Sequence, residues 1–349
     1  YPMNSYRMAD SSQFILDGNK NSRTKVKPVL TPGKIGNAIS FIGEYDELYL
    51  EKAGLFESYE PFSVAVWVKT SKREKNKTQT LMGNTGQKNN FWRGWDFFLD
   101  AENRVNARLV HSLPHSYVQV SSIDSVRRNK WSHVSFTFDG SATAQGIRIF
   151  IDGREAKTNV LYDKLYKSIY PVRVGTHVPQ ERALAVAKSY RMHTGEFGIF
   201  KGLMDDIRIF NRELSSLEVK VIYNSAEAVN KAPVAEEDFN EYRASVDPLI
   251  RSHESELKGL RRNLLEVVGG VDEVMVMQEM EKPRETFVLV RGQYDALGER
   301  VEPGTPEVVL PFSKDLPPNR LGLAKWIFDE KNPLPARVTV NRYWQMIFG

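Results

Sequence analysis

The segment from Asn90 to Trp95 carries the richest mixture of aromatic and planar polar side chains in the sequence. A sugar ring stacks its apolar face on an aromatic side chain, and its hydroxyls need amide or guanidinium partners. The segment therefore predicts a sugar-binding surface, to which neighbouring loops would contribute. The predicted ligand-binding residues are Asn90, Trp92, Arg93, Trp95, His115, Tyr117 and Arg191, with Tyr190 beside them.

The same aromatic residues also have a structural interpretation. Trp95 and Phe97 share one face of a predicted strand, because alternate residues of a strand point the same way. Both would then lie in the core, with Trp92 as a loop anchor. Trp67 and Trp131 are expected in the core on either interpretation. The sequence leaves both interpretations open.

Histidines show no spacing that predicts a catalytic site. His111 and His115 stand four residues apart, as metal-binding pairs do on helices, but Pro114 and the adjoining strands argue against a helix there. The remaining histidines have no acidic or hydroxyl neighbour that suggests a triad, although a fold can assemble one from distant residues. Glycine loops that bind phosphate are absent from the sequence. We therefore name no catalytic residue.

The 349 residues contain no cysteine, are 41% hydrophobic and carry a net charge of +4. The absence of thiols excludes disulfides, thiolate metal sites and covalent haem attachment within this segment. The small net charge disfavours nucleic acid as a partner, and no apolar run approaches the ~20 residues of a membrane helix. Because Tyr1 is not an initiator methionine, we expect both ends to lie inside a longer chain that a signal peptide could precede.

Alternating side chains predict a mainly β structure up to residue 212. Val134, Phe136 and Phe138 share one face of a strand, as in a half-buried antiparallel sheet. Asp139-Gly140 and Asp152-Gly153 supply residues that tolerate positive φ where two such strands end. The other predicted strands are 38–41, 62–70, 95–99, 104–110, 118–120, 171–174 and 203–210.

Helical patterns begin near residue 213. Ser215 and Glu218 have the spacing of a capping box, and Asp247-Pro248 suits the start of a second helix. That helix is expected to connect domains; a coiled coil is the weaker alternative, because its apolar stripe covers few heptads. The stripe consists of Ile250, Leu257, Leu260, Leu264 and Val268. After a strand at 286–291 and an amphipathic helix around Trp326, the predicted domains are 1–225, 226–281 and 282–349.

Five motifs, taken in order, carry a resemblance to a known fold. They are AISFIGEYDELYL from residue 38, FSVAVWVKT from residue 62, KWSHVSFTFDGS from residue 130, RIFIDG from residue 148 and GLMDDIRIFNRELSSLEV from residue 202. Together they resemble the laminin-G-like, or concanavalin A-like, jelly roll over residues 1–225. The resemblance implies a mainly β sandwich, followed by a helical connector and a truncated α+β segment.

Longer motifs resemble a narrower family. RGWDFFLD (93–100), ARLVHSLPHSYVQV (107–120) and DGSATAQG (139–146) are similar to the jelly-roll insert of large Planctomycete-type cytochrome-associated proteins. Residues 273–312 and 319–349 are similar to the start of their C-terminal domain of unknown function. The resemblance implies a parent chain with an upstream cytochrome c-like region, in the periplasm or at the cell surface. It implies no activity, because the function of that family is unknown.

The jelly-roll resemblance also concerns Asp205, which shares strand parity with Ile207 and Ile209 and should point inward. An unpaired carboxylate there would be costly. In the resembled fold the equivalent residue often holds a structural calcium ion with backbone carbonyls, and oxygen ligands suit this hard cation. The alternative is that Asp205 accepts backbone N–H bonds or pairs with an arginine. Asp206 is expected to pair with Arg208 on the same face.

Glucanases of the resembled fold would need carboxylates at Glu-x-Asp-x-x-Glu spacing on one strand. That spacing is absent: Glu44 and Asp46 come nearest, but Tyr49 stands at the third position. The leading hypothesis is therefore a non-catalytic recognition module, directed to polysaccharide, within an extracytoplasmic protein. A structural spacer in a haem-linked assembly and a polysaccharide-cleaving enzyme are the alternatives.

Overall fold

The computed structural model divides the chain into two compact units, Tyr1–Asp272 and Glu273–Gly349. The residues that it describes are 6–10, 13–16, 22–23, 29–42, 48–51, 53–71, 78–85, 92–170, 183–188, 198–224, 235–272, 274, 276, 280 and 284–349. The domain limits expected at residues 225 and 281 stay predictions.

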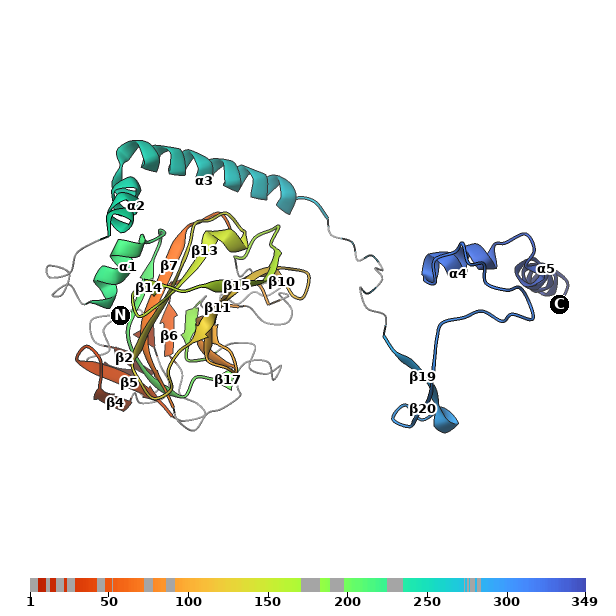
Figure 1. Ribbon diagram of the computed structural model, residues 1–349, viewed down its shortest axis with the longest axis horizontal. Helices are drawn as coiled ribbons and strands as arrows, with labels where there is room; N and C mark the ends of the chain where they lie inside the picture. Colours follow the sequence, from red (N-terminus) through yellow and green to blue (C-terminus); the bar gives the residue numbers. More distant parts are fainter. Residues whose placement is uncertain are drawn as a thin grey trace. The chain divides into compact units, whose positions relative to one another are not determined.

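Two sheets pack face to face in the first unit (Figure 1). The larger sheet has the strand order β15-β11-β10-β9-β8-β16-β6-β3, and β17 pairs with β8 in parallel. The smaller sheet has the order β14-β13-β12-β7-β18-β5-β4. All the other described pairings of these two sheets are antiparallel. The predicted mainly β jelly-roll sandwich is confirmed.

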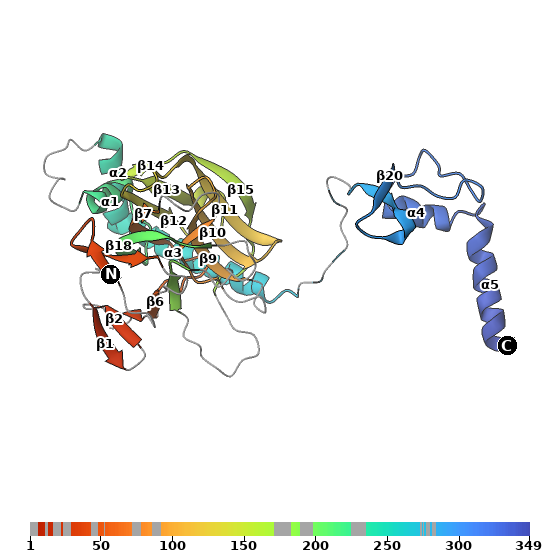
Figure 2. The same ribbon diagram turned by 90° about the horizontal axis from the view of Figure 1, so that it is seen from below.

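The strands keep their labels in all the figures. Those of the larger sheet are β3 (Ser22–Arg23), β6 (Leu48–Glu51), β8 (Gln79–Gly83), β9 (Gly94–Leu99), β10 (Arg104–Ser112), β11 (Ser116–Ser125), β15 (Thr158–Lys164), β16 (Ala183–Val186) and β17 (Gly198–Ile199). Those of the smaller sheet are β4 (Val29–Pro32), β5 (Asn37–Phe41), β7 (Phe62–Thr70), β12 (Ser132–Phe138), β13 (Ile147–Ile151), β14 (Arg154–Glu155) and β18 (Gly202–Phe210). A separate hairpin consists of β1 (Tyr6–Asp10) and β2 (Gln13–Leu16) (Figure 2).

The core lies between the two sheets and is filled from alternate strand positions. Val134, Phe136 and Phe138 of β12 point into it and are fully buried, as their spacing predicts. The ring of Phe62 on β7 lies 5.4 Å from Phe136 and 5.6 Å from Trp95, measured between ring centroids. Aromatic side chains from both sheets therefore meet at the centre of the core.

Most predicted strands are confirmed, with small changes at their ends. β7 matches the predicted segment 62–70, and β5, β9, β10 and β18 extend the predicted ranges by one or two residues. β11 is much longer than the predicted segment 118–120. The prediction is too short because the last residues of the strand are exposed and show no apolar alternation. The strand predicted at 171–174 lies outside the described residues.

One helix covers the outer face of the smaller sheet. α1 (Ser216–Tyr223) begins with the predicted capping box, in which Ser215 and Glu218 bond each other's backbone N–H through their side chains. Its apolar side packs on the sheet in a small cluster separate from the core. This cluster consists of Ala65, Phe150, Leu214, Val219 and Ile222.

The two tryptophans expected in the core differ from each other. Trp67 is buried as predicted, but it lies beneath α1 on the outer face of the smaller sheet. Its indole stacks on Tyr223, at 5.4 Å between centroids, and meets His133 edge-on at 5.2 Å. Trp131 is only half-buried, so its prediction as a core residue is wrong. It precedes β12 and therefore takes no part in the inward alternation of that strand.

Two further helices of the first unit are attached mainly through charged side chains. In α2 (Glu236–Val246) and α3 (Pro248–Gly269) every described side chain is exposed or half-buried. α2 is bound through an ion pair of 2.6 Å between Arg148 and Glu241. The predicted start of α3 is confirmed, because Asp247 accepts hydrogen bonds from the first backbone N–H groups of the helix.

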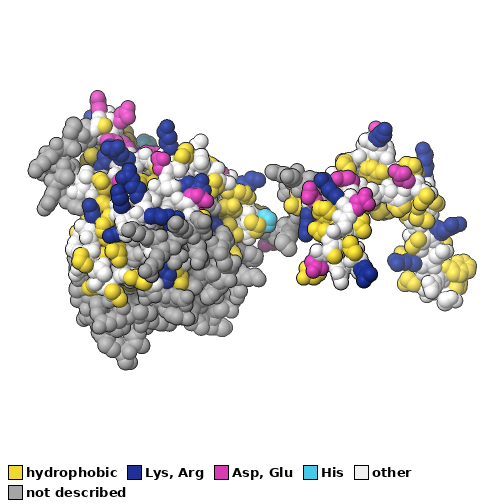
Figure 3. All heavy atoms as spheres, turned by 60° about the horizontal axis from the view of Figure 1, so that its bottom comes forward, with side chains coloured by type: hydrophobic (Ala, Val, Ile, Leu, Met, Phe, Trp, Pro, Cys, Tyr) yellow, Lys and Arg dark blue, Asp and Glu magenta, His cyan; other side chains and the backbone are white. Residues whose placement is uncertain are grey.

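The second unit is small and open. It contains the hairpin β19 (Thr286–Leu289) and β20 (Leu297–Val301), and the helices α4 (Arg320–Ile327) and α5 (Pro333–Phe348) (Figure 2). The strand predicted at 286–291 ends early, because Arg291 adopts a positive φ of 52° inside a 3-10 turn. Trp326 anchors the predicted helix α4, and its Nε1 donates to the carbonyl of Leu310 at 2.8 Å. Many hydrophobic side chains of this unit lie on its surface (Figure 3).

Among the described residues, no helix is long and apolar enough to cross a membrane.

Candidate functional site

The outer face of the larger sheet is polar. Trp95, Phe97 and Leu99 of β9 enter the core, so the residue between the first two, Asp96, points to the opposite face. The same alternation on β10 and β11 brings further polar side chains to that face. They are Asn106, Arg108, Gln119 and Ser121. We call this surface the polar face.

Strand register aligns polar residues in a row across five strands. Arg108 on β10 is paired with Asp96 on β9 and with Gln119 on β11. Gly83 on β8 is paired with Asp96, and Tyr162 on β15 is paired with Gln119. Directly opposed residues have Cβ atoms about 5 Å apart, so their side chains interact. Residues that are 79 positions apart in sequence thus form one continuous row.

A buried ion pair lies at the centre of this row. Arg108 Nη2 donates to Asp96 Oδ2 at 2.8 Å, and Thr85 Oγ1 donates to Asp96 Oδ1 at 2.8 Å. The relative exposure of Asp96 is 0% and that of Arg108 is 4%. Gly83 makes room for the carboxylate, because a Cβ at that position would lie 2.8 Å from Asp96 Oδ1. Both carboxylate oxygens are bonded, so this pair fixes the face and leaves no free acid or base.

The row opens towards solvent at β11 and β15. The rings of Tyr117 and Tyr162 stack with their centroids 4.0 Å apart and their planes 8° from parallel, and both residues are half-buried. Tyr162 Oη donates to the carbonyl of His115 at 3.2 Å. Gln119 Nε2 donates to Asn106 Oδ1 at 3.1 Å. The exposed Lys164 stands opposite Tyr117 in the register.

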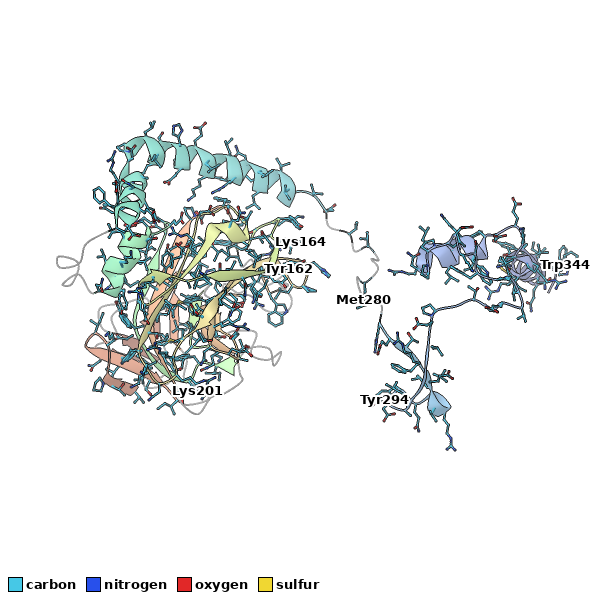
Figure 4. All side chains as sticks on the ribbon, in the orientation of Figure 1. Tyr162, Lys164, Lys201, Met280, Tyr294 and Trp344 are labelled. Atoms are coloured by element: carbon cyan, nitrogen blue, oxygen red, sulfur yellow. The ribbon has the colours of Figure 1, made fainter. Side chains whose placement is uncertain are left out.

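We call Tyr117, Gln119, Tyr162 and Lys164 the tyrosine edge. Figure 4 shows Tyr162 and Lys164 close together at the end of the first unit's strands. Stacked aromatic rings next to an amide and an ammonium group provide an apolar platform with polar groups at its border. This arrangement can bind a ligand.

A second polar contact lies at the end of β10. Arg93 Nη2 lies 3.4 Å from His111 Nε2, and His111 Nδ1 lies 2.7 Å from the carbonyl of Ser168. A guanidinium only donates hydrogen bonds, so Nε2 accepts and Nδ1 carries the proton. The His111 ring therefore holds Arg93 at the end of β10.

A serine, a histidine and a glutamate meet here without forming a catalytic triad. Ser168 Oγ donates to Glu57 Oε1 at 2.6 Å, whereas His111 meets Ser168 at its backbone carbonyl. Burial raises the pKa of Glu57, and the bond from Ser168 opposes that rise. A triad requires the histidine to take the proton of the hydroxyl. The hydroxyl proton of Ser168 is directed to the carboxylate of Glu57 instead, so these three residues do not have the bonding of a triad.

Comparison with known families agrees with this fold. The concanavalin A-like lectin/glucanases superfamily matches residues 43–220, just over half of the 349 residues. The chain belongs to the concanavalin A-like lectin/glucanase superfamily. A second match, to a protein of unknown function (DUF1553), covers residues 319–349. These matches confirm the jelly-roll resemblance over residues 43–220 and the resemblance of residues 319–349 to a domain of unknown function. No curated protein sequence matches the chain.

Solved structures are similar to this superfamily member only at a distance. The binding domain of Paraclostridial Mosquitocidal Protein 1 is 13% identical, with a TM-score of 0.44, over 64% of this chain and 52% of that one. The IT-sialidase CBM40 of Ruminococcus gnavus is 16% identical, with a TM-score of 0.36, over 47% and 83%. Domain 4 of an extracellular arabinanase of Geobacillus stearothermophilus, solved with arabinotriose, is 17% identical, with a TM-score of 0.35, over 57% and 82%. The chain spans about half the length of the first of these proteins.

The residues predicted to bind a ligand fall into different parts of this concanavalin A-like domain. Trp95 is wrong as a ligand residue: its indole is fully buried in the core, and Nε1 donates to the carbonyl of Gly54 at 2.7 Å. The strand parity that it shares with Phe97 explains this result. Trp92 and Arg93 are half-buried. Asn90, Tyr190 and Arg191 lie outside the described residues.

Two predicted residues meet in the concanavalin A-like domain, at the tyrosine edge. Tyr117 contributes one of its rings, and the backbone of His115 receives the hydroxyl of Tyr162. The imidazoles of His111 and His115 differ in environment, since His111 is buried and His115 exposed. Ligand binding by Tyr117 stays a prediction.

Sequence reasoning missed Tyr162, Gln119 and the pair of Asp96 with Arg108. The available signal was the alternation of polar residues with core residues along β9, β10 and β11. β15 carried almost no signal, because six of its seven residues are exposed and only Tyr162 is half-buried.

Asp205 is buried, and hydrogen-bond donors surround its carboxylate. Oδ2 accepts the backbone N–H of Lys34 at 2.9 Å and that of Ile35 at 2.8 Å. Burial raises the pKa of Asp205, and these N–H bonds oppose the rise. A Cβ on Gly33 would lie 2.6 Å from Oδ2, so the 33–36 turn closes tightly around this oxygen. The alternative expectation, that Asp205 accepts backbone N–H bonds, is therefore met. The predicted ion pair of Asp206 with Arg208 is also confirmed, at 2.9 Å.

The surroundings of Asp205 do not fit a calcium ion at Oδ2. Calcium needs six to eight oxygen ligands, whereas N–H groups point at this oxygen. Across the described ranges, no three His, Cys, Asp or Glu side chains are grouped to hold a metal. The calcium site stays a prediction that the geometry of Lys34 and Ile35 disfavours. Glu44 and Asp46, the nearest approach to a glucanase pattern, lie outside the described residues.

Proposed function

We propose that this chain is a non-catalytic carbohydrate-binding module whose ligand contacts the tyrosine edge. One observation carries the proposal: two parallel tyrosine rings lie half-exposed at the open end of a polar sheet face. An apolar sugar face stacks on such a ring, and the neighbouring Gln119 and Lys164 supply groups that bind hydroxyls. The superfamily to which the chain belongs includes lectins, as its description states.

Hydrogen bonds hold two residues of the tyrosine edge in place before a ligand arrives. Tyr162 is fixed by its hydrogen bond to the carbonyl of His115, and Gln119 by its bond to Asn106. Behind them, the ion pair of Arg108 with Asp96 fixes the row on which they stand. A rigid platform loses less conformational entropy on binding than a mobile one. The buried ion pair thus supports binding indirectly, because it fixes the row of residues on which the tyrosine edge stands.

A structural spacer is the second candidate, and a specific observation favours it. The central part of the polar face is closed, since Asp96 and Arg108 are almost fully buried, and Trp95 lies in the core. On this alternative the tyrosines only seal the edge of the sheet. Polysaccharide cleavage receives less support from the described face, because both carboxylate oxygens of Asp96 are already bonded, one to Arg108 and one to Thr85.

The setting of the module is also part of the proposal. We infer an extracytoplasmic location next to cytochrome c-like domains of a longer parent chain. The sequence resemblance of residues 93–146 and 273–349 supports this inference. Cell fractionation with an antibody against this chain would test the location, and haem absorbance of the purified parent would test the partner domains. A parent found in the cytoplasm without haem would contradict both.

Calorimetric titration of the full chain against neutral and acidic polysaccharides tests the binding function. Wild-type protein should give a saturable signal with at least one polysaccharide. Tyr162→Ala should weaken that binding about tenfold, a loss of about 1.4 kcal/mol, because a stacking surface is removed. Tyr166→Ala is the matched control, since Tyr166 is 60% exposed and follows the same strand but lies outside the stacked pair.

The two candidates give different titration results. A signal that falls with Tyr162→Ala and persists with Tyr166→Ala supports the tyrosine edge. Flat traces with every polysaccharide, from a chain whose circular dichroism shows a folded β protein, support the spacer. Binding that both variants retain in full would contradict the tyrosine edge as the site.

A further inference from the structure

Helix α3 presents its apolar side chains to solvent. Six of them have relative exposures between 38% and 71%. They are Ile250, Leu257, Leu260, Leu264, Val267 and, just beyond the end of the helix, Val271. A surface helix normally buries its apolar stripe against its own domain, so this stripe is available for another surface.

The exposed side chains follow a heptad pattern. With Ile250 as position a, Leu257, Leu264 and Val271 also occupy a, and Leu260 and Val267 occupy d. His253 is the remaining d residue. Apolar residues at a and d form the seam of a coiled coil, and we call these residues the α3 seam. The α3 seam differs from the stripe predicted from the sequence, which included Val268. In the structure Val268 is half-buried and lies at position e, outside the seam.

The side of α3 next to these seam residues contacts the sandwich. Lys258 Nζ lies 3.1 Å from Glu60 Oε1, and Arg261 Nη1 donates to the carbonyl of Asp139 at 2.8 Å. Lys258 and Arg261 occupy positions b and e, which lie beside the seam on the helix surface. In Figure 1, α3 runs from α2 along one border of the strands of the first unit. The sandwich therefore binds α3 through polar contacts, among them Lys167 Nζ on the carbonyl of Val271, and the side chains of the seam stay exposed.

We propose that the α3 seam pairs with the seam of a second copy of this chain in a two-stranded coiled coil. Charge complementarity favours a second copy. In a parallel pair, Glu256 at position g of one helix faces Arg261 at position e of the other, whose Nη1 also donates to the carbonyl of Asp139. In an antiparallel pair, Glu254 at position e of one helix faces Arg261 at position e of the other. Either arrangement brings two attractive pairs together and no repulsive pair between these positions.

Light scattering of the full chain over a wide concentration range tests the pairing. The mass should rise with concentration from 39.9 kDa to twice that value. The double variant Leu260→Lys/Leu264→Lys should remain a monomer, because it places four like charges in the paired seam. Ser252→Lys/Ser255→Lys is the matched control: it adds the same charge at positions c and f, away from the seam, and should still form the dimer.

Other apolar surfaces of the chain need their own control. Val340 and Ile347 on α5 are 63% and 70% exposed and could also associate. The variant Val340→Lys/Ile347→Lys should therefore leave the dimer intact. A chain that stays monomeric at every concentration overturns the proposal. A dimer that survives in the seam variant, or that disappears in the α5 variant, also overturns it.

Cysteine cross-linking locates the contact, because the chain has no cysteine of its own. Leu257→Cys should form an intermolecular disulfide in a parallel pair, since facing a residues have Cα atoms about 6 Å apart. In an antiparallel pair, Leu257 faces Leu260, so Leu257→Cys/Leu260→Cys should cross-link instead. Ser255→Cys, on the far side of the helix, should not. Failure of both seam variants to cross-link beyond the level of Ser255→Cys overturns the proposal.

Discussion

The outer faces of the two sheets differ in what covers them. On the smaller sheet, α1 of the same chain closes the face and packs Trp67 beneath Tyr223. On the larger sheet, a polar row ends in the half-exposed rings of Tyr117 and Tyr162. A face that its own helix has closed contributes to stability. The face that ends in an open aromatic pair is the one that can receive a ligand.

The two faces also treat buried polar groups differently. On the larger sheet, Asp96 and Arg108 satisfy each other in an ion pair. On the smaller sheet, neither ring nitrogen of His133 has a hydrogen-bond partner among the described residues, although His133 is only 1% exposed. Burial lowers the pKa of His133 to about 4, while the charge of Asp206 opposes and that of Arg208 adds to this change. The first face should therefore be sensitive to loss of a partner, and the second to protonation.

The largest effect is expected from breaking the ion pair of the larger sheet. Arg108→Met leaves the buried carboxylate of Asp96 without its cation. Removal of one partner of a buried pair costs about 3–5 kcal/mol, so the free energy of unfolding in urea should fall by that amount. Arg104→Met, on the same strand but with a side chain 40% exposed, is the matched control and should lose less than about 1 kcal/mol. If Arg108→Met and Arg104→Met lost equal unfolding free energy, the claim that burial makes the Arg108 ion pair important would be contradicted.

The smaller sheet should lose stability in acid through His133. Its folded-state pKa of about 4 lies below the ordinary value of 6.5, so the unfolded state binds more protons between these pH values. Stability is therefore present above pH 6.5 and is lost as the pH falls towards 4. The difference of 2.5 units corresponds to about 3 kcal/mol at 1.36 kcal/mol per unit. His133→Phe keeps a ring against Trp67. Between pH 6.5 and 4, the unfolding free energy of this variant should fall by about 3 kcal/mol less than that of wild type.

Glu213 provides a contrast of opposite sign. Burial raises its pKa to about 7 from an ordinary 4.5, with Asp139 adding to the rise and Arg148 opposing it. The folded state then binds more protons between those pH values, so this contribution to stability is lost as the pH rises from 4.5 to 7. Glu213→Gln should flatten the profile of unfolding free energy against pH between pH 4.5 and 7.

The His133 prediction has its own contradicting outcome. A His133→Phe profile parallel to that of wild type at every pH would contradict the assigned role of His133.

A smaller effect is expected at Asp205, at the margin of the smaller sheet. Asp205→Ala removes the acceptor of the N–H groups of Lys34 and Ile35 and should cost about 2 kcal/mol, the usual value for hydrogen bonds to a charged group. Asp205→Asn retains an accepting oxygen and should lose less. Neither calcium nor a chelator should shift the melting temperature of wild type. A rise with calcium that Asp205→Asn abolishes would show that the carboxylate is a metal ligand.

Features encoded by local patterns could be predicted from the sequence. The capping box of Ser215 and Glu218 and the helix start at Asp247 are each specified within four residues, and both are present. β7 was predicted at its observed ends because its inward side chains alternate regularly. β15 was not predicted, because an exposed edge strand needs no apolar pattern.

The candidate site depended on register, which the local sequence does not specify. Asp96 and Arg108 become neighbours only when β9 and β10 pair as observed, and a slip of one residue would put either side chain in the core. Tyr162 reaches Tyr117 across another pairing, between β11 and β15. Trp95 was assigned to the ligand surface from its residue type, whereas its parity with Phe97 decided its place.

A crystal structure of the chain with the polysaccharide fragment that binds best in titration tests the central claim most directly. We predict a sugar ring parallel to Tyr162 or Tyr117, with hydroxyls bound by Gln119 or Lys164. A sugar bound at any other described surface, with the tyrosine edge unoccupied, would contradict the account.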